Sequence, residues 1–287
     1  RRAPHLNHGI LLIAAASALL ATNTTMAKLS YMAGLTAPAL LLIRYLIGSA
    51  AFATLLRLRD LPIIPPGAGR RTLGAAAIVL VPSLLFLGSA SRIPLSLSVV
   101  LVFTYPVWTV LLSHLMKLEQ ITARKAGAVA IAITGIALTV GPDFSRLDPW
   151  GVAMAALAGI SFGLIPTVAR RMTHDVDPMQ VNAFVSFLGI PVTLALGLAT
   201  SGLTPPASAG VWLTTLGSAA FYIAGFALLL MGIPRTEPTR AAVTQTLEPL
   251  CTVILAMVIL GEPLVAIQLV GAALILVAIL TVAWRPK

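Results

Sequence analysis

The chain has 287 residues, of which 58% are hydrophobic and only 10% are charged, and its mean hydropathy is +0.98. Ordinary globular domains carry roughly 25% charged residues, so a chain this apolar could not cover itself with polar surface in water. The formal charge of +10 does not indicate nucleic acid as a partner, because the basic residues stand between apolar runs and form no single patch. The lone cysteine, Cys251, excludes an internal disulfide and any multi-cysteine metal site. We therefore expect an all-α polytopic membrane protein with the lipid bilayer around it and no metal or other cofactor.

A helix needs about 20 apolar residues to cross the hydrocarbon core of a bilayer, and ten segments of the chain meet that requirement. In chain order they are 9–27, 37–56, 71–90, 95–115, 123–140, 150–169, 180–200, 210–231, 240–260 and 264–284. These runs are continuously apolar and do not alternate, which excludes barrel strands. The first segment is interpreted as a span and not as a signal peptide, because no small-residue cleavage site leads into a polar mature domain.

Lysine and arginine alternate between the connections. The two ends and one set of connections hold fifteen of these residues, the other set holds three, and Arg44 alone lies within a span. Because cytoplasmic loops are enriched in Lys and Arg, we expect both termini in the cytoplasm and a protein integral to the cytoplasmic (inner) membrane. The chain has no G-x-x-x-x-G-K-[ST] phosphate loop, so any transport it performs would be driven by a gradient or be passive.

The sequence repeats itself at an offset of 143 residues. Residues 105–119 (YPVWTVLLSHLMKLE) match residues 248–262 (EPLCTVILAMVILGE), and the Pro-to-Glu spacing is 13 in both copies. The halves are about 1–142 and 146–287, with five spans each. An odd number of spans makes the second half enter the membrane from the other side, so we expect two inverted five-helix repeats with a solute site near the midplane between them. Glu119 would then be cytoplasmic and Glu262 external.

The stretch GSASRIPLSLSVVLVFTYPVWTVLLSHLMKLE, which is followed by Gly127 and Gly135, resembles the ten-helix (EamA-type) branch of the drug/metabolite transporter superfamily. Its counterpart around Pro249 and Glu262 resembles that branch too, as does Arg44 in span two. Within the branch the chain looks most like the YddG-type exporters of aromatic amino acids. The resemblance implies two five-helix bundles, a central cavity, alternating access and a small-molecule substrate. Protons are a candidate coupling ion.

Polar side chains within spans are costly in lipid and tend to face the bundle interior or a cavity. On span four, Ser98, Tyr105 and Thr109 fall on one helical face, and the repeat superposes Tyr105 on Glu248. Glu248 is the only carboxylate deep within a span. It could bind an amino group or carry a proton, or it could be a structural acid between helices. Arg44 could hold a carboxylate by a bidentate contact, or it could be a helix-packing charge.

Four aromatic side chains lie deep enough in the spans to stack on a planar solute, although each could equally pack between helices: Tyr105, Trp108, Phe162 and Tyr222. Asn23 and Ser83 are further candidates for contact with a substrate. Pro106 and Pro249 are the best hinge candidates, since proline removes a backbone hydrogen bond and the repeat places these two symmetrically. Static bends, which are common in membrane helices, are the alternative interpretation.

Residues 159–163 match the G-x-S-x-G pattern of hydrolases, but that motif requires a strand-to-helix turn and these residues lie within a span. We therefore expect no enzyme and interpret the small residues as points of close helix packing. The leading hypothesis is a secondary transporter or facilitator that exports small metabolites, with amino acids favoured and aromatic ones first among them. A transporter of cationic drugs or other metabolites is one alternative, and a passive channel is an alternative of another class.

Overall fold

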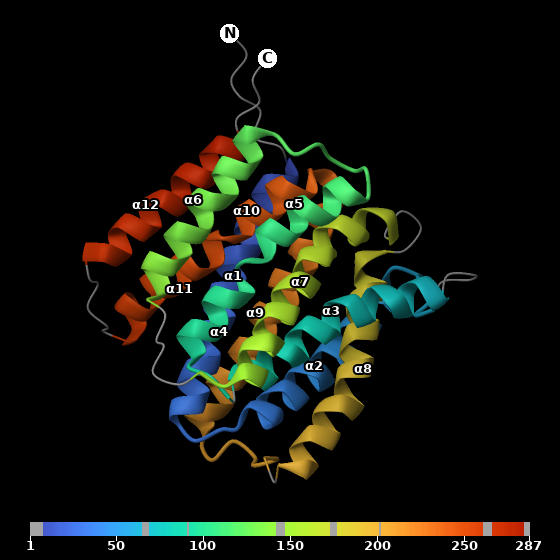
Figure 1. Cartoon of the computed structure of the whole chain (residues 1–287). Coiled ribbons are helices and arrows are strands. Elements are labelled where there is room, and N and C mark those ends of the chain that lie inside the picture. The colour runs from blue at the N-terminus through green and yellow to red at the C-terminus, as the bar shows by residue number, and fades with distance from the viewer. Residues whose placement is uncertain are drawn as a thin grey trace.

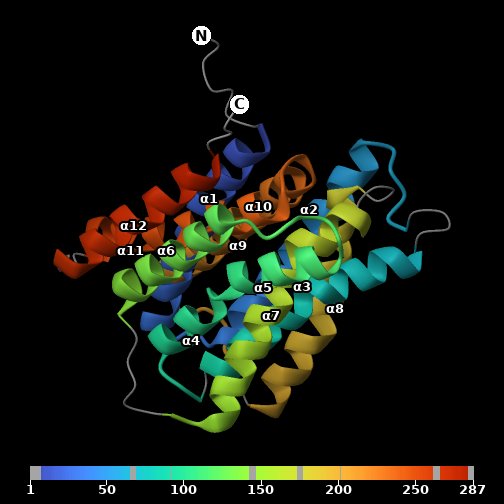
Figure 2. The same cartoon turned by 45° about the horizontal axis from the view of Figure 1, so that its top comes forward.

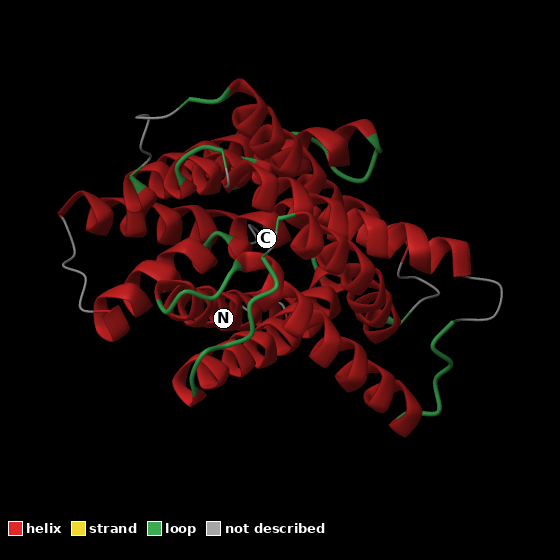
Figure 3. Cartoon of the chain, turned by 90° about the horizontal axis from the view of Figure 1, so that it is seen from below, coloured by secondary structure: helices red, strands yellow, loops and turns green. Residues whose placement is uncertain are grey.

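The computed structural model describes residues 8–64, 69–90, 92–141, 147–172, 177–200, 202–260 and 266–283, so Glu262 and the junction between the two expected halves lie outside the described residues. Within those ranges helices are the only regular secondary structure (Figure 3). They are α1 (His8–Met32), α2 (Ala37–Leu58), α3 (Gly69–Ala90), α4 (Leu95–Val102), α5 (Tyr105–Leu115), α6 (Ala123–Val140), α7 (Pro149–Met172), α8 (Pro178–Ala199), α9 (Ala209–Gly232), η1 (Ile233–Arg235), α10 (Pro238–Gln245), α11 (Leu247–Leu260) and α12 (Ala266–Ala283).

The helices have the length and composition of a polytopic membrane protein. Nine helical stretches of the described chain are long and apolar enough to cross a membrane, and Ala266–Val282 is a shorter apolar helix. Large apolar side chains point outward, with Leu213, Val258 and Leu280 exposed by 73%, 69% and 68%. Such a surface suits lipid, because hydrocarbon tails cover apolar side chains without cost.

Local sequence explains where several helices begin. At three starts a polar side chain accepts a backbone N–H of the first turn, and these N-cap residues are Thr122 for α6, Asp177 for α8 and Ser208 for α9. The first N–H groups of a helix have no partner within the helix, and an N-cap side chain satisfies one of them. Gly141 ends α6 with a φ of +63°, a left-handed conformation that glycine adopts without strain.

Spans four and nine are not continuous helices, which corrects the expectation from the sequence. Span four is interrupted at Phe103 and Thr104, between α4 and α5, and span nine at Thr246, between α10 and α11. The repeat offset of 143 carries α4 onto α10 residue for residue. Pro106 and Pro249 lie in the first turn after each interruption, where the missing N–H of proline is tolerated. Both halves therefore break the same span at the same place.

The helices pack in pairs that respect the sequence repeat. α1 packs along α9, α3 along α7, α2 along α8 and α6 along α12. The repeat relates α1 to α7, α3 to α9, α2 to α8 and α6 to α12. If the two halves are exchanged, the α1–α9 pair therefore becomes the α7–α3 pair, and the other two pairs stay the same. Figures 1 and 2 both show α6 and α12 side by side at one edge of the bundle, away from α2, α3 and α8. This pattern of contacts is the one that a two-fold relation between the halves produces.

The broken spans lie between two apolar clusters. One cluster joins α1, α3, α7, α8 and α9, and it includes Ala241 of α10. The other joins α5, α6, α11 and α12, and it includes Val243 of α10. Neighbouring residues of α10 therefore contribute to both cores, so the interruptions are held in place from two sides.

Glycines allow several of these helices to approach closely. A Cβ added at Gly135 would lie 2.8 Å from the carbonyl oxygen of Gly271 and 2.9 Å from Ile275 Cγ1, so α6 and α12 are in contact through their backbones. A Cβ at Gly163 would lie 2.7 Å from Trp108 Cβ, and one at Gly159 would lie 3.0 Å from the Leu101 carbonyl oxygen. The close-packing interpretation of residues 159–163 is confirmed.

We expect Gly135→Ala to lower the unfolding free energy by about 1–3 kcal/mol, because the added methyl meets backbone that cannot move aside. The matched control is Gly127→Ala on the same helix, where an added Cβ meets nothing within 4 Å and alanine should favour the helix by about 1 kcal/mol. Thermal unfolding in detergent should separate the two variants in opposite directions. Equal midpoints for both would contradict the close contact between α6 and α12.

Candidate functional site

Arg44 of α2 is the centre of a polar cluster that joins three helices. Its Nη2 donates to Asn23 Oδ1 of α1 at 3.1 Å and to Ser218 Oγ of α9 at 3.4 Å. Ser218 Oγ in turn donates to the same Asn23 oxygen at 2.8 Å. The guanidinium is thereby fixed in orientation, and two of the predicted residues, Arg44 and Asn23, are brought together. Ser218 was missed by the sequence analysis, although a serine within a span is itself a signal of this kind.

The aromatic ring of Tyr222 lies beneath the guanidinium. Arg44 Cζ is 4.4 Å from the centre of that ring, a geometry in which the cation is attracted by the ring face. Tyr222 also contacts Phe226, with 5.2 Å between ring centres. One face of Tyr222 therefore serves Arg44 and cannot at the same time stack on a solute.

Arg44 has donor capacity that the protein does not use. Its Nε is buried and has no hydrogen-bond partner among the described residues, and no carboxylate of that part of the chain forms an ion pair with the guanidinium. A buried charge without an opposite charge is costly in a membrane. The guanidinium is thus held by neutral groups and left able to accept an anion.

Glu248 lies in the first turn of α11 and is half-buried. Its carboxylate makes no hydrogen bond or ion pair with any other residue in the described ranges. Tyr105 and Tyr222 both lie within electrostatic range of this carboxylate, and Tyr222 is within range of Arg44 as well. Glu248 and Arg44 are therefore both within electrostatic range of Tyr222, and no hydrogen bond or ion pair joins the two charged residues.

The interruptions of the two broken spans meet at Tyr105. Its hydroxyl donates to the Ala242 carbonyl oxygen at 2.9 Å. That carbonyl is available because the Thr246 N–H, its usual partner four residues later, bonds to Val243 instead at 3.2 Å. A residue just after the first break thus satisfies a group freed by the second, and Ala242 is a contact that the sequence did not predict.

Phe162 lies near Tyr105, and Trp108 packs against the neighbouring helix α7. The ring centres of Tyr105 and Phe162 are 6.4 Å apart, and those of Tyr105 and Phe103 are 5.8 Å apart. Phe162 and Trp108 are both half-buried, and Trp108 packs with its Cβ against Gly163 of α7. The aromatic side chains therefore come from two helices, with Tyr105 and Trp108 in α5 and Phe162 in α7.

The polar groups of span four do not form one shared face as expected. Ser98 shares a hydrogen bond with Ser89 of α3 at 2.7 Å, whereas Thr109 donates to the Gly163 carbonyl oxygen of α7 at 3.3 Å. The break between them turns the two parts of the span toward different neighbours. Ser83 donates to the Val79 carbonyl oxygen of its own helix at 3.4 Å and forms no hydrogen bond with the Arg44 cluster.

Together these groups offer two opposite charges around an aromatic ring. A molecule with an anionic and a cationic end could place the first against Arg44, whose fork suits a carboxylate, and the second against Glu248. Neither charge is neutralised by the protein itself. The arrangement can bind a small zwitterion.

A model of the EamA-like transporter family matches the chain twice, over residues 7–141 and again over residues 149–284. The two matches together leave only short segments of the sequence uncovered.

Several relatives of the chain are named as transporters. An uncharacterized transporter of Archaeoglobus fulgidus is 25% identical over 221 residues, which is 75% of this chain and 77% of that protein. The threonine/homoserine exporter RhtA of Salmonella typhimurium is 26% identical, and that of Escherichia coli is 27% identical. Each of these two comparisons covers 68% of this chain and 64% of the exporter. None of these three relatives is named as an exporter of aromatic amino acids, so the resemblance to that type of exporter stays a prediction.

A protein of known crystal structure has the same fold. It superposes with a TM-score of 0.81 over 95% of this chain and 96% of its own, at 15% sequence identity. At that identity the likeness concerns the fold alone.

We expect Tyr105→Phe to lower the unfolding free energy by about 1–3 kcal/mol, because the Ala242 carbonyl would be left buried without its donor. Tyr31→Phe is the matched control, since Tyr31 is 42% exposed and its hydroxyl forms no hydrogen bond with the described part of the chain. Thermal unfolding in detergent measures both. A Tyr105→Phe midpoint no lower than that of Tyr31→Phe would show that the bond between the two breaks contributes little.

Proposed function

Because the chain belongs to the EamA-like transporter family, whose members are membrane transporters and not enzymes, we propose that it exports α-amino acids by alternating access around a site between Arg44 and Glu248. The observation that carries this proposal is that Arg44, which lies over the Tyr222 ring, and Glu248, which is within electrostatic range of the same tyrosine, form no ion pair with each other or with any other described residue. The names of the RhtA relatives also support an amino-acid substrate.

The α-carboxylate and α-ammonium groups of an amino acid match the two charged ends of the site. The carboxylate would accept from Arg44, including its unused Nε, while Asn23 and Ser218 keep the guanidinium in place. The ammonium would donate to Glu248. Both protein charges would then be paired only when substrate is bound, and charge-assisted hydrogen bonds of this kind are the strong ones.

The two broken spans suit the movement that alternating access requires. We infer that Pro106 and Pro249 act as hinges, since each follows an interruption where few backbone hydrogen bonds resist bending. The symmetric pairing of helices supports two inverted five-helix repeats, one in each half, with the substrate between them. The alternation of Lys and Arg supports cytoplasmic termini and a place in the inner membrane.

Two observations favour different side chains on the amino-acid substrate. The sequence resemblance favours aromatic amino acids, for which Trp108 and Phe162 offer half-buried rings. The RhtA relatives favour small hydroxylated ones. Aromatic and small hydroxylated amino acids share the α-carboxylate and α-ammonium groups that Arg44 and Glu248 would bind. The proposal therefore concerns these shared groups, and the experiment below distinguishes the side chains.

The test is flux of labelled threonine, homoserine, phenylalanine and tryptophan into liposomes that contain the purified protein, with and without a proton gradient. We expect saturable uptake of at least one of them. Arg44→Lys and Glu248→Gln should each reduce it about tenfold or more, because each loses a charge-assisted contact. Thr134→Val on the exposed side of α6 is the matched control and should transport normally.

Each outcome decides a different part of the proposal. Uptake that a proton gradient stimulates would identify protons as the coupling ion, while indifference to the gradient would indicate facilitated diffusion. Uptake that does not saturate would identify a channel. No flux of any of the four above empty liposomes, with folded protein, would overturn the amino-acid substrate.

A further inference from the structure

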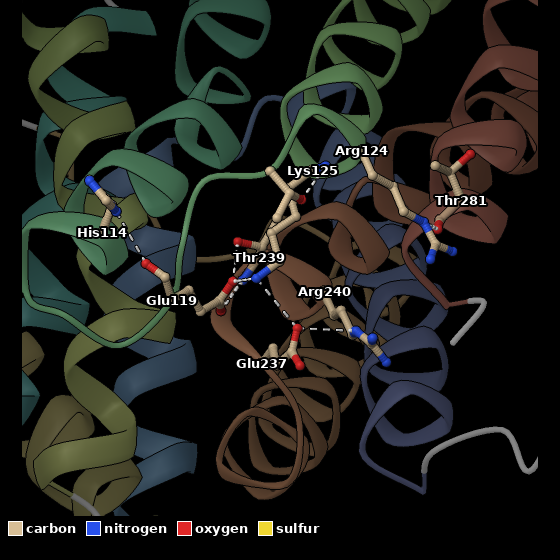
Figure 4. A network of polar contacts seen from close by, with 9 residues as sticks. His114, Glu119, Arg124, Lys125, Glu237, Thr239, Arg240 and Thr281 are labelled. Carbon is tan, nitrogen blue, oxygen red and sulfur yellow. Dashed lines mark hydrogen bonds and ion pairs between the residues drawn. The ribbon is translucent and has the colours of Figure 1, made fainter. Parts of the chain in front are cut away.

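A partly buried network of charges joins the two halves at the end of the bundle where α1 begins and α12 ends, which we call the terminal face (Figures 1 and 4). Its central residue is Glu119, in the connection after α5, with a side chain only 5% exposed. The carboxylate of Glu119 accepts from the Thr239 backbone N–H at 3.1 Å and from Thr239 Oγ1 at 2.8 Å. A residue of the first half therefore caps the start of α10 in the second half.

Lys125 of α6 ties this contact to further charges. Its Nζ lies 2.5 Å from Glu119 Oε2 and 3.6 Å from Glu237 Oε2, and Glu237 also pairs with Arg240 Nε at 3.3 Å. Figure 4 shows these side chains converging from α6 and α10. The network thus holds the connection between α5 and α6 against the beginning of the broken span α10–α11.

Adjacent to this network, the same face has a second contact between the halves. Arg124 Nε donates to the Thr281 carbonyl oxygen near the end of α12 at 2.7 Å, as Figure 4 also shows. A carboxylate with several donors around it is costly to separate from them when buried. Moving α10 away from α6 would require that separation at Glu119.

At the other end of the bundle, which we call the opposite face, the repeat has no charged residues at the positions equivalent to Lys125, Glu237 and Arg240. At the offset of 143 residues, the partners Glu237, Thr239 and Arg240 correspond to positions 94, 96 and 97, which are Pro, Ser and Leu, and Glu119 corresponds to Glu262, which lies outside the described residues. Lys125 corresponds to Gln268, whose Nε2 donates to the Thr139 carbonyl oxygen at 3.3 Å. The charged partners therefore exist in one half only.

The ion pair that does cross between the halves near the opposite face is of a different kind. Arg92 Nη1 lies 3.0 Å from Asp148 Oδ2, and these side chains are 48% and 25% exposed. Exposed pairs contribute little to stability. The two ends of the bundle thus differ in how strongly charges hold the halves together.

We propose that Glu119 and its partners Lys125, Thr239, Glu237 and Arg240 form a one-sided latch that closes the terminal face, so that the resting protein opens toward the opposite face. This inference rests on the alternating access proposed above, and it adds which state the free protein prefers. Breaking the latch shifts the population toward the state that is open at the terminal face and closed at the other.

The test measures accessibility and needs no transport. In a Cys251→Ser background, Thr244→Cys on α10 reports the terminal side, and Leu101→Cys, its repeat equivalent on α4, reports the other side. Thr244 is fully buried and Leu101 is half-buried in this structure. The rate of modification by a bulky maleimide is measured on folded protein in detergent, where both faces are reachable, with and without Glu119→Gln.

We expect Glu119→Gln to raise the modification rate at Thr244→Cys roughly tenfold and to lower the rate at Leu101→Cys. Asp148→Asn, which removes the exposed pair near the opposite face, is the control and should change neither rate. Glu237→Gln should act in the same direction as Glu119→Gln but less strongly, and it replaces that variant if Glu119→Gln does not fold.

Two results would overturn the latch. Unchanged rates at both reporters would show that the network does not set the conformation. A rise at Thr244→Cys without a fall at Leu101→Cys would show that the charges only prevent local fraying of α10. A failure of amino-acid flux would leave both measurements unaffected, so the latch and the proposed substrate fail separately.

Discussion

The hydrogen bond from the Tyr105 hydroxyl to the Ala242 carbonyl oxygen joins the two places where the backbone leaves regular helix inside the bundle. Backbone groups without partners are costly within a membrane, so interruptions are tolerated only where protein or water satisfies them. Here each half supplies a broken span, and a side chain next to one break satisfies a carbonyl freed at the other. Phe162 lies beside this junction, and Glu248 lies within electrostatic range of Tyr105.

The charges of the protein are distributed unevenly around that junction. Arg44 and Glu248 lie deep in the bundle without opposite charges of their own, whereas Glu119 and Lys125 pair closely at the terminal face. Both kinds of charge suit a transporter. A charge without a partner can pair with a bound substrate, and an ion pair within the protein can stabilise one conformation. The charged side chains therefore do not follow the sequence repeat, which distinguishes the two ends of the bundle.

Much of the fold could be predicted because a membrane helix is specified by local composition. The segment expected at 123–140 is a helix with those bounds. The segment expected at 37–56 is a helix that begins at Ala37 and ends two residues later than expected, at Leu58. The interruptions were missed because a proline that kinks a helix and one that begins a helix look the same in sequence. Only the matching positions of Pro106 and Pro249 in the repeat pointed to a shared feature.

The site was predicted less completely than the fold, because contacts between helices are not encoded locally. Polar residues within spans identified Arg44, Asn23 and Glu248 as candidates, but nothing in the sequence shows that Asn23 orients Arg44 through Ser218. Ser83 had the same signal and bonds only to its own helix. The partner of Glu119 could not be inferred either, since Thr239 is 120 residues away in the chain.

The most direct test of the central claim is an experimental density map of the protein with a bound amino acid that it transports. The account predicts density between Arg44 and Glu248, beside Tyr222, with the carboxylate at the guanidinium and the ammonium at Glu248. An amino acid bound elsewhere in the bundle, with Arg44 and Glu248 unchanged in their contacts, would contradict it.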